Sequence, residues 1–358
     1  MSPVFIIAEA GVNHNGDKNQ AFELVDIAIS CGADAIKFQT FVTENMVTKT
    51  ASKASYQIDN NKKYESQYQM LKNLELPRNT YFEIQEYCKK RNIEFMSTAF
   101  DLSSLDFLIN ELSISRLKYP SGEINNAPLL LEHARSGKPI IISTGMSTNK
   151  DIINALGVAA FGYLNLKNPS IESFKKAYKS DEGQEIILQK VSLLHCTTEY
   201  PTALENVNLN AMKEMMKSFG LATGYSDHTE GFITAISAVA MGAEIIEKHI
   251  TLDKNLEGPD HSASSEPEEF KLLIDSIRNV ESLLGLAEKN LTEMEIKNKM
   301  VSRKSIVAKT NIIAGDKFSY HNLTCKRPGN GIDPFRYWDL IGTIAKKAYE
   351  MDEQIDEQ

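Results

Sequence analysis

Two histidines in this 358-residue sequence are placed as metal ligands would be. His228 and His249 each follow a short apolar run, and the two runs are consecutive in the chain. Imidazole nitrogens bind divalent cations, and a site with two protein ligands leaves coordination positions open for a substrate oxygen. Glu9 and Asp260 could complete or orient such a site, and oxygen-rich surroundings favour Mn²⁺ or Mg²⁺ over Zn²⁺. We expect a catalytic divalent metal, Mn²⁺ or Mg²⁺; the competing interpretation is two histidines bonded to backbone groups.

Lysines and serines that end other apolar runs form a second group. Ammonium groups, serine hydroxyls and the backbone N–H groups around Gly122 and Gly145 can together bind a phosphate and a carboxylate. We expect an anion site formed by Lys37, Lys118, Ser121, Ser143 and Ser226. Either lysine could instead form a Schiff base with a carbonyl substrate, so an imine-forming aldolase is a rival hypothesis.

Carboxylates and hydrogen-bonding side chains near these groups indicate proton transfer and hydroxyl binding. Glu9, Glu123 and Asp260 are candidate acids, bases or ligands of hydroxyl groups. Glu123 follows the expected anion site directly, where it could move a proton or stabilise positive charge on a reacting carbon. Gln39 and Tyr200 could bind the hydroxyls of a polyol.

Eight apolar runs would position all of these side chains. Continuous apolar runs are typical of parallel strands buried on both faces, and a (β/α)₈ barrel carries its active site at the carboxyl ends of such strands. Helical patterns separate the runs, so strands and helices alternate as in a parallel sheet. We predict an α/β fold, a (β/α)₈ TIM barrel. The expected strands lie at 4–8, 35–36, 93–96, 116–117, 139–142, 191–194, 222–225 and 243–246, and the expected helices at 19–31, 78–91, 102–112, 128–135, 149–160, 210–218, 231–241 and 267–284.

Changes in residue composition and hydrophobic pattern divide the chain into three parts. Residues 1–284 carry the barrel pattern, 285–303 form a charged helical linker, and 304–358 contain short strand-like pieces broken by Gly and Pro. A β-rich domain of about 55 residues is marginally stable alone, so we expect it to dock on something. Within the barrel, 42–75 is predicted to form a lid or flap, and 163–189 is a polar excursion after the fifth helix.

Composition excludes several functional classes. The net charge of −9 argues against non-specific nucleic-acid binding, which requires a basic surface, although local lysines can still bind a small anion. No run reaches the roughly 20 apolar residues of a membrane span, and no signal-length apolar segment follows a basic start. Four cysteines without paired spacing indicate reduced thiols, and Cys196, with no base assigned to it, is interpreted as a packing residue. We expect a cytoplasmic protein without nucleic-acid or membrane partners.

Several of these residues lie in longer motifs that resemble those of the bacterial sialic acid synthase (N-acetylneuraminate synthase) family. The motifs cover nearly the whole chain in the family's order: AEAGVNHNG (8–16), KFQT (37–40), PSGE (120–123), STGM (143–146), HCTTEYP (195–201), YSDHT (225–229), EKH (247–249) and GPDH (258–261). KRPGNG (326–331) resembles the hallmark of the family's C-terminal antifreeze-like (SAF) domain. The sequence departs from the family pattern at Ala99, Tyr119 and Thr198, none of which is a proposed metal ligand.

The resemblance implies condensation of phosphoenolpyruvate with an N-acetylated mannose-type sugar, with release of phosphate by C–O cleavage. It implies a divalent metal on His228 and His249, usually manganese, with Mg²⁺ or Co²⁺ as alternatives. It also implies a cation-stabilising role for Glu123. The positions that match phosphoenolpyruvate-binding residues are Lys37, Thr98, Lys118, Ser121, Ser143 and Ser226. The positions that match sugar-binding residues are Glu9, Gln39, Tyr200 and Asp260.

The same resemblance bears on assembly and on the acceptor. Arg327 matches an arginine that crosses from the partner subunit to the sugar's N-acetyl group, which implies a domain-swapped homodimer. The first interpretation is an N-acetylneuraminate synthase acting on N-acetylmannosamine. The alternative is a legionaminic or pseudaminic acid synthase acting on a 2,4-diacetamido-trideoxy hexose, since these enzymes share nearly the same motifs. A non-enzymatic ice- or carbohydrate-binding protein is disfavoured, because 304–358 lacks the regular Thr array of an ice-binding face.

Overall fold

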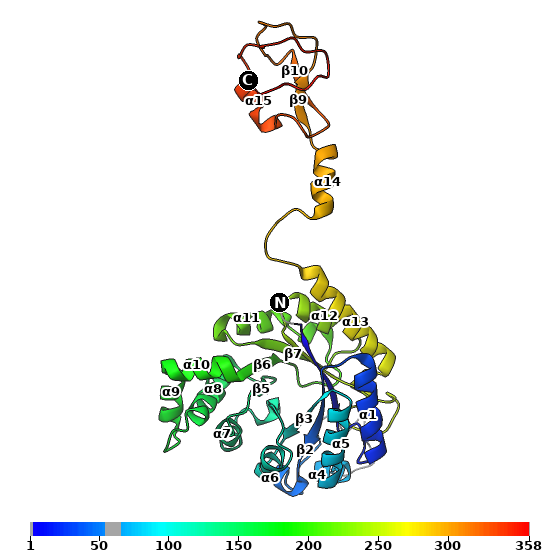
Figure 1. The fold of residues 1–358 in the computed structure, drawn as a ribbon. Helices are drawn as coiled ribbons and strands as arrows, with labels where there is room; N and C mark the ends of the chain where they lie inside the picture. The colour runs from blue at the N-terminus through cyan, green and yellow to red at the C-terminus, as the bar shows by residue number, and fades with distance from the viewer. Residues whose placement is uncertain (1–2, 54–65, 358) are drawn as a thin grey trace. The chain divides into compact units, whose positions relative to one another are not determined.

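A closed barrel of eight parallel strands forms the centre of the first of two compact units, Met1–Gly285 (Figure 1). The computed structural model describes residues 3–53 and 66–357. The strands follow one another around the barrel in chain order, and the last pairs with the first. The predicted (β/α)₈ fold is confirmed. Its strands are β1 (Phe5–Gly11), β2 (Ala35–Thr40), β3 (Glu94–Ala99), β4 (Leu117–Tyr119), β5 (Ile140–Ser143), β6 (Val191–His195), β7 (Thr223–Asp227) and β8 (Ile245–His249).

Side-chain alternation along the strands separates an outer core from an inner one. The outer core packs strand residues such as Ile6 and Phe38 with the surrounding helices. The barrel interior holds a separate apolar cluster: Ile7, Ala35, Met96, Ile141, Leu194 and Ile245. Two residues further along each of these segments, and therefore on the same face, lie Glu9, Lys37, Thr98, Ser143, Cys196 and Glu247. An apolar layer thus lies directly beneath a polar one, as expected of layered barrel interiors.

Helices cover the outside of the barrel and begin with side-chain caps where the sequence offers them (Figure 1). Asp17 accepts hydrogen bonds from N–H groups of the first turn of α1, and Thr148 forms a capping box with Asp151 at the start of α8. Each predicted helix is present, with ends shifted by a few residues, and the one predicted at 102–112 continues as the π-helical η1 (Phe107–Glu111). The helices are α1 (Lys18–Cys31), α5 (Arg78–Lys90), α6 (Leu102–Asp106), α7 (Ala127–Arg135), α8 (Asn149–Tyr163), α11 (Leu209–Phe219), α12 (Ile233–Ala240) and α13 (Pro267–Leu284).

The two long connections contain further helices. After β2 the chain forms α2 (Thr43–Met46) and α4 (Gln67–Leu74); residues 54–65, on which part of the predicted lid falls, lie outside the described residues. The excursion after α8 folds into α9 (Ile171–Lys179) and α10 (Asp181–Lys190). It packs closely on α8, because a Cβ on Gly157 would lie 2.9 Å from the Phe174 carbonyl oxygen.

The second unit, Leu286–Gln358, has a core of its own. It begins with α14 (Glu293–Ser302), whose Thr292 cap forms a capping box. An antiparallel pair, β9 (Ser305–Ala308) and β10 (Leu323–Lys326), and the short α15 (Tyr337–Leu340) follow. Across the chain all four cysteines are free, and within the described residues no helix is long and apolar enough to cross a membrane.

Candidate active site

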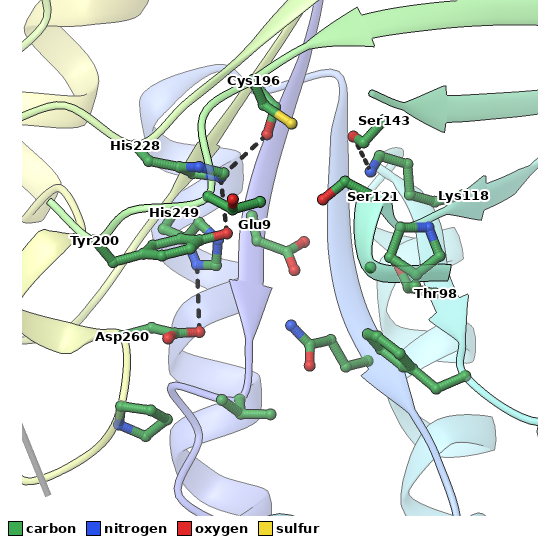
Figure 2. Close-up of a pocket in the computed structure, with 18 of the residues that line it drawn as sticks. Glu9, Thr98, Lys118, Ser121, Ser143, Cys196, Tyr200, His228, His249 and Asp260 are labelled. Atoms are coloured by element: carbon green, nitrogen blue, oxygen red, sulfur yellow. Dashed lines mark hydrogen bonds and ion pairs between the residues drawn. The ribbon is translucent and has the colours of Figure 1, made fainter. Parts of the chain in front are cut away.

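A cavity of about 410 Å³ opens at the carboxyl ends of the barrel strands (Figure 2). Every strand, or the residue that follows it, contributes to the lining, so the register of the barrel determines which side chains meet. The cavity brings together most of the residues singled out in the sequence: Glu9, Lys37, Gln39, Thr98, Lys118, Ser121, Ser143, Tyr200, Ser226, His228, His249 and Asp260.

The cavity has two chemically different sides (Figure 2). On one side lie the side chains that suit an anion, and on the other those that suit a metal and a hydroxylated substrate. Glu9 lies between them. The anion side carries Thr98, Lys118, Ser121 and Ser143, and the other side carries Tyr200, His228, His249 and Asp260.

A buried carboxylate, Glu247, links the two lysines of the anion side. Its Oε2 lies 3.6 Å from Lys37 Nζ and its Oε1 lies 3.6 Å from Lys118 Nζ. Ser226 donates a hydrogen bond to Oε1 at 2.9 Å. Lys37 also forms an ion pair with Glu9 at 2.6 Å, and Lys118 donates to the Ser143 hydroxyl at 2.7 Å. The lysines therefore already face acceptors of the kind that a phosphate or carboxylate would supply.

Burial and charge act on these groups in opposite directions. Burial opposes ionisation of Glu247, but Lys118 and Lys37 outweigh it and hold the pKa of this carboxyl below its usual range. Burial dominates at Glu9 and raises its pKa despite the contact with Lys37. The pKa of Lys37 is raised, since its two carboxylate neighbours outweigh burial, whereas burial lowers the pKa of Lys118. Lys37 is thus held as a cation, and Lys118 is the better candidate for the rival imine chemistry.

The two histidines meet at the ends of β7 and β8, with ring centroids 5.6 Å apart. His228 Nδ1 donates to the Thr197 carbonyl at 2.5 Å, so the proton sits on Nδ1 and Nε2 keeps its lone pair. The hydroxyls of Tyr200 and Ser226 lie 3.1 and 3.3 Å from that Nε2. Burial lowers the pKa of His228 to about 4, and burial together with His228 lowers the pKa of His249. Both rings are therefore neutral, the form that binds metals.

The residues present fit a divalent cation. His249 Nδ1 is buried without a hydrogen-bond partner and lies 3.8 Å from Asp260 Oδ2. Glu9 Oε2 is likewise buried without one, although it contacts Lys37. Among residues 3–53 and 66–357, no group of three or more His, Cys, Asp or Glu is arranged to hold a metal. A cation here would rest on two imidazoles, and substrate oxygens would complete its coordination.

Close packing shapes the anion side around Gly145. A Cβ at this position would lie 2.8 Å from Thr198 Cγ2, 2.9 Å from Cys196 Sγ and 3.2 Å from Ser121 Oγ. Any larger residue would displace the wall that carries Ser121. Cys196 is buried, and burial raises the pKa of its thiol, which keeps it protonated and is consistent with a packing role.

Glu123 is a predicted site residue that does not line this cavity. Ser121 and Gly122 line the cavity, but Glu123, at the end of the 3₁₀ turn η2 (Ser121–Glu123), is not among the lining residues. Its Oε2 accepts a hydrogen bond from Asn126 at 2.7 Å. Arg327 belongs to the second unit, directly after β10, and its part in the site stays a prediction.

Sequence reasoning missed two sets of residues. Glu247 belongs to the motif EKH (247–249) and has no predicted role, although strand alternation places it on the same face as His249. The outward faces of β7 and β8 carry a fully buried ion pair, Lys248 Nζ to Asp227 Oδ2 at 2.9 Å. Lys248 also donates to the Thr229 carbonyl at 2.6 Å, and Asp227 accepts from the Thr229 N–H at 2.9 Å. This pair fixes the backbone on both sides of His228 without reaching the cavity.

Comparison with known proteins gives consistent matches. The model of the NeuB family matches residues 24–289. The chain is 46% identical to N,N'-diacetyllegionaminic acid synthase of Campylobacter jejuni, over all of both chains. It is 43% identical to the enzyme of the same name from Legionella pneumophila, over 95% of this chain and 89% of that one. Among solved structures it resembles the N-acetylneuraminic acid (sialic acid) synthetase of Leptospira borgpetersenii, with 32% identity and a TM-score of 0.66, over 83% of this chain and 90% of that one.

The buried ion pair between Lys248 and Asp227, which lies outside the cavity, leads to a testable prediction. Lys248→Met leaves the Asp227 carboxylate buried and unpaired, so we expect the free energy of unfolding to fall by about 3 kcal/mol. In the double variant Asp227→Asn/Lys248→Met the stranded charge is gone, and urea denaturation should show most of that stability restored. If the pair positions His228, the double variant should still bind Mn²⁺ about tenfold more weakly than wild type in titration calorimetry. Wild-type affinity in the double variant would contradict this role.

Proposed function

The chain belongs to the NeuB family of sugar-acid synthases, and we propose that it condenses phosphoenolpyruvate with a 2,4-diacetamido-2,4,6-trideoxy hexose to give N,N'-diacetyllegionaminic acid. The observation that carries the choice of product is the identity of 46% and 43% to two enzymes of that name, against 32% to a sialic acid synthetase. The sequence motifs placed N-acetylmannosamine first and the diacetamido sugar second. The similarity favours the second.

The anion side of the cavity supports a phosphoenolpyruvate site. Lys37 and Lys118 supply positive charge, and the hydroxyls of Thr98, Ser143 and Ser226 supply hydrogen bonds for phosphate and carboxylate oxygens. These ammonium and hydroxyl donors lie in a buried pocket, where a charge-assisted hydrogen bond to an anion is stronger than in water. When phosphoenolpyruvate binds, its phosphate and carboxylate oxygens take the place of two contacts within the protein. These are the contact of Lys118 with Ser143 and the contact of Lys37 with Glu9.

The reaction then joins the two substrates across the cavity. Carbon 3 of phosphoenolpyruvate forms a bond to the aldehyde carbon of the open-chain acceptor, water adds to carbon 2, and the C–O bond to phosphate breaks. Glu9, whose pKa is raised, lies between the two sides and is placed to hold or pass a proton near the acceptor oxygen. Gln39, Tyr200 and Asp260 also line the cavity and would orient the hydroxyls of the acceptor.

His228 and His249 would hold the divalent metal, with His228 presenting Nε2. When bound, the cation supplies polarisation of the acceptor's carbonyl oxygen. The chain's own contribution is to keep both imidazoles neutral and to fix the His228 ring through the Thr197 carbonyl.

The acceptor is tested directly. With phosphoenolpyruvate and Mn²⁺, we expect phosphate release to be at least about tenfold more efficient, as kcat/KM, with the diacetamido-trideoxy hexose than with N-acetylmannosamine. Phosphate release is measured with a coupled assay and the product identified by mass spectrometry. A preference for N-acetylmannosamine would restore the first interpretation. With pyruvate in place of phosphoenolpyruvate, trapping of a pyruvate imine on Lys118 by borohydride would establish the aldolase instead.

Metal dependence is a separate prediction. We expect exhaustive chelation to abolish phosphate release and added Mn²⁺ to restore it. His228→Ala should weaken Mn²⁺ binding by more than about tenfold in titration calorimetry, a loss that even outer-sphere changes can cause. His195→Ala is the matched control, since His195 ends β6 but bonds the Val207 carbonyl and does not line the cavity. Full phosphate release after exhaustive chelation would contradict the metal hypothesis.

The predicted dimer is tested by complementation. If Arg327 reaches the partner's cavity, an Arg327→Ala chain and a His228→Ala chain should each be inactive alone. Mixed after subunit exchange, they form dimers in which the Arg327→Ala subunit keeps both histidines and receives Arg327 from its partner. We expect activity to return to about a quarter of wild type for random pairing, since half of the dimers then carry one intact site. Demonstrated exchange without recovered activity would show that Arg327 does not act across subunits.

A further inference from the structure

One wall of the cavity is apolar and has no part in the chemistry described above. Six lining side chains belong to a single apolar cluster that is separate from the main core: Val12, Met46, Met70, Leu71, Leu74 and Phe100. All lie beyond the strand ends, on α2, on α4 or on the segments that follow β1 and β3. The polar groups that would bind phosphoenolpyruvate and the metal come mainly from the strands themselves, so the wall faces whatever part of the acceptor extends away from the reacting carbon.

The helix α4 presents its residues to the cavity with helical spacing. Gln67, Met70, Leu71 and Leu74 stand at positions i, i+3, i+4 and i+7, which form one stripe of a helix. Three of them are apolar, and Gln67 at the start of the stripe adds an amide that can both donate and accept hydrogen bonds.

Contacts with neighbouring segments hold this wall in place. The Glu75 carboxylate at the end of α4 accepts a hydrogen bond from the Thr43 N–H of α2 at 2.7 Å. Lys72 of α4 forms ion pairs at 3.0 Å with both Glu44 and Glu75. The end of α4 also packs closely on the turn after β1, because a Cβ on Gly16 would lie 2.6 Å from the Asn73 carbonyl oxygen.

We propose that this wall recognises the end of the acceptor that lacks a hydroxyl, with the terminal methyl group against Met46 and the α4 stripe and the second acetamido group near Gln67. The inference rests on the proposed function, since that acceptor differs from N-acetylmannosamine in these two groups. An apolar surface favours a methyl group over a hydroxymethyl group, because the hydroxyl would lose its hydrogen bonds to water on burial. Contacts of this kind discriminate by about tenfold to a hundredfold.

The test uses Met46→Gln, because Met46 is only partly buried and the change nearly preserves side-chain length. Met146→Gln is the matched control: Met146 lines the same cavity, lies after β5 on a different wall, and is 73% exposed. Three acceptors are compared: the diacetamido-trideoxy hexose, N-acetylmannosamine and 6-deoxy-N-acetylmannosamine. The last two differ only in the hydroxyl that the wall is proposed to exclude.

We expect Met46→Gln to lower the ratio of kcat/KM for the 6-deoxy sugar over N-acetylmannosamine by about tenfold, with an unchanged KM for phosphoenolpyruvate. Met146→Gln should change kcat/KM by the same factor for both of these acceptors, so that their ratio stays as in wild type. If Met46→Gln lowers kcat/KM for all three acceptors by the same factor, the wall does not discriminate between the sugars. The inference then fails, while the proposed function stands. If the wild-type enzyme turns over N-acetylmannosamine but not the diacetamido sugar, the proposed function fails. Thermal unfolding of both variants checks that the fold is intact.

Discussion

The buried carboxylate of Glu247 is the interaction on which the rest of the site depends. Two lysine ammonium groups in one cavity repel each other and lose their hydration, so burial alone would drive one of them to the neutral form. Glu247 lies 3.6 Å from both nitrogens and remains ionised because of them. Its other neighbour, the Ser226 hydroxyl, also contacts His228 Nε2, so the same carboxylate connects the anion side of the cavity to the side that carries the two histidines.

The register of the barrel strands brings these polar side chains together, and their meeting at the strand ends could be predicted from the sequence. Apolar runs such as 139–142 and 191–194 locate the strands, and polar residues directly after them must meet once a parallel barrel closes. In the structure Glu9 pairs with Lys37 on one side and with His249 on the other, and Thr98 pairs with Lys118. Contacts between residues far apart in the chain therefore follow from local patterns and the known handedness and order of one fold.

Some features were missed although the sequence carried a signal, and others needed the structure. In the motif Glu247-Lys248-His249, strand alternation puts Glu247 on the same face as the predicted ligand His249. The ion pair that Lys248 forms with Asp227 on the opposite face is seen only in the structure. The aromatic and apolar residues of the α4 wall gave no signal, because an apolar helical stripe normally indicates core packing. Glu123 was expected beside the anion site because it follows Ser121 and Gly122, but the tight turn there directs its carboxylate to Asn126.

These differences suggest how one barrel could serve several acceptors. A strand-borne group such as Lys118 or Ser226 cannot shift without disturbing the pairing of its strand, so the anion side of the cavity and the side that carries the two histidines are fixed together. The α4 wall is joined to α2 by the hydrogen bond from the Thr43 N–H to Glu75 and by one partly exposed ion pair, Lys72 to Glu44, and such a pair contributes only about 0–1 kcal/mol. Residues of the wall can therefore change while the strands stay in place. Catalysis of the condensation would then be a property of the barrel, and the choice of sugar a property of the connections that follow its first three strands.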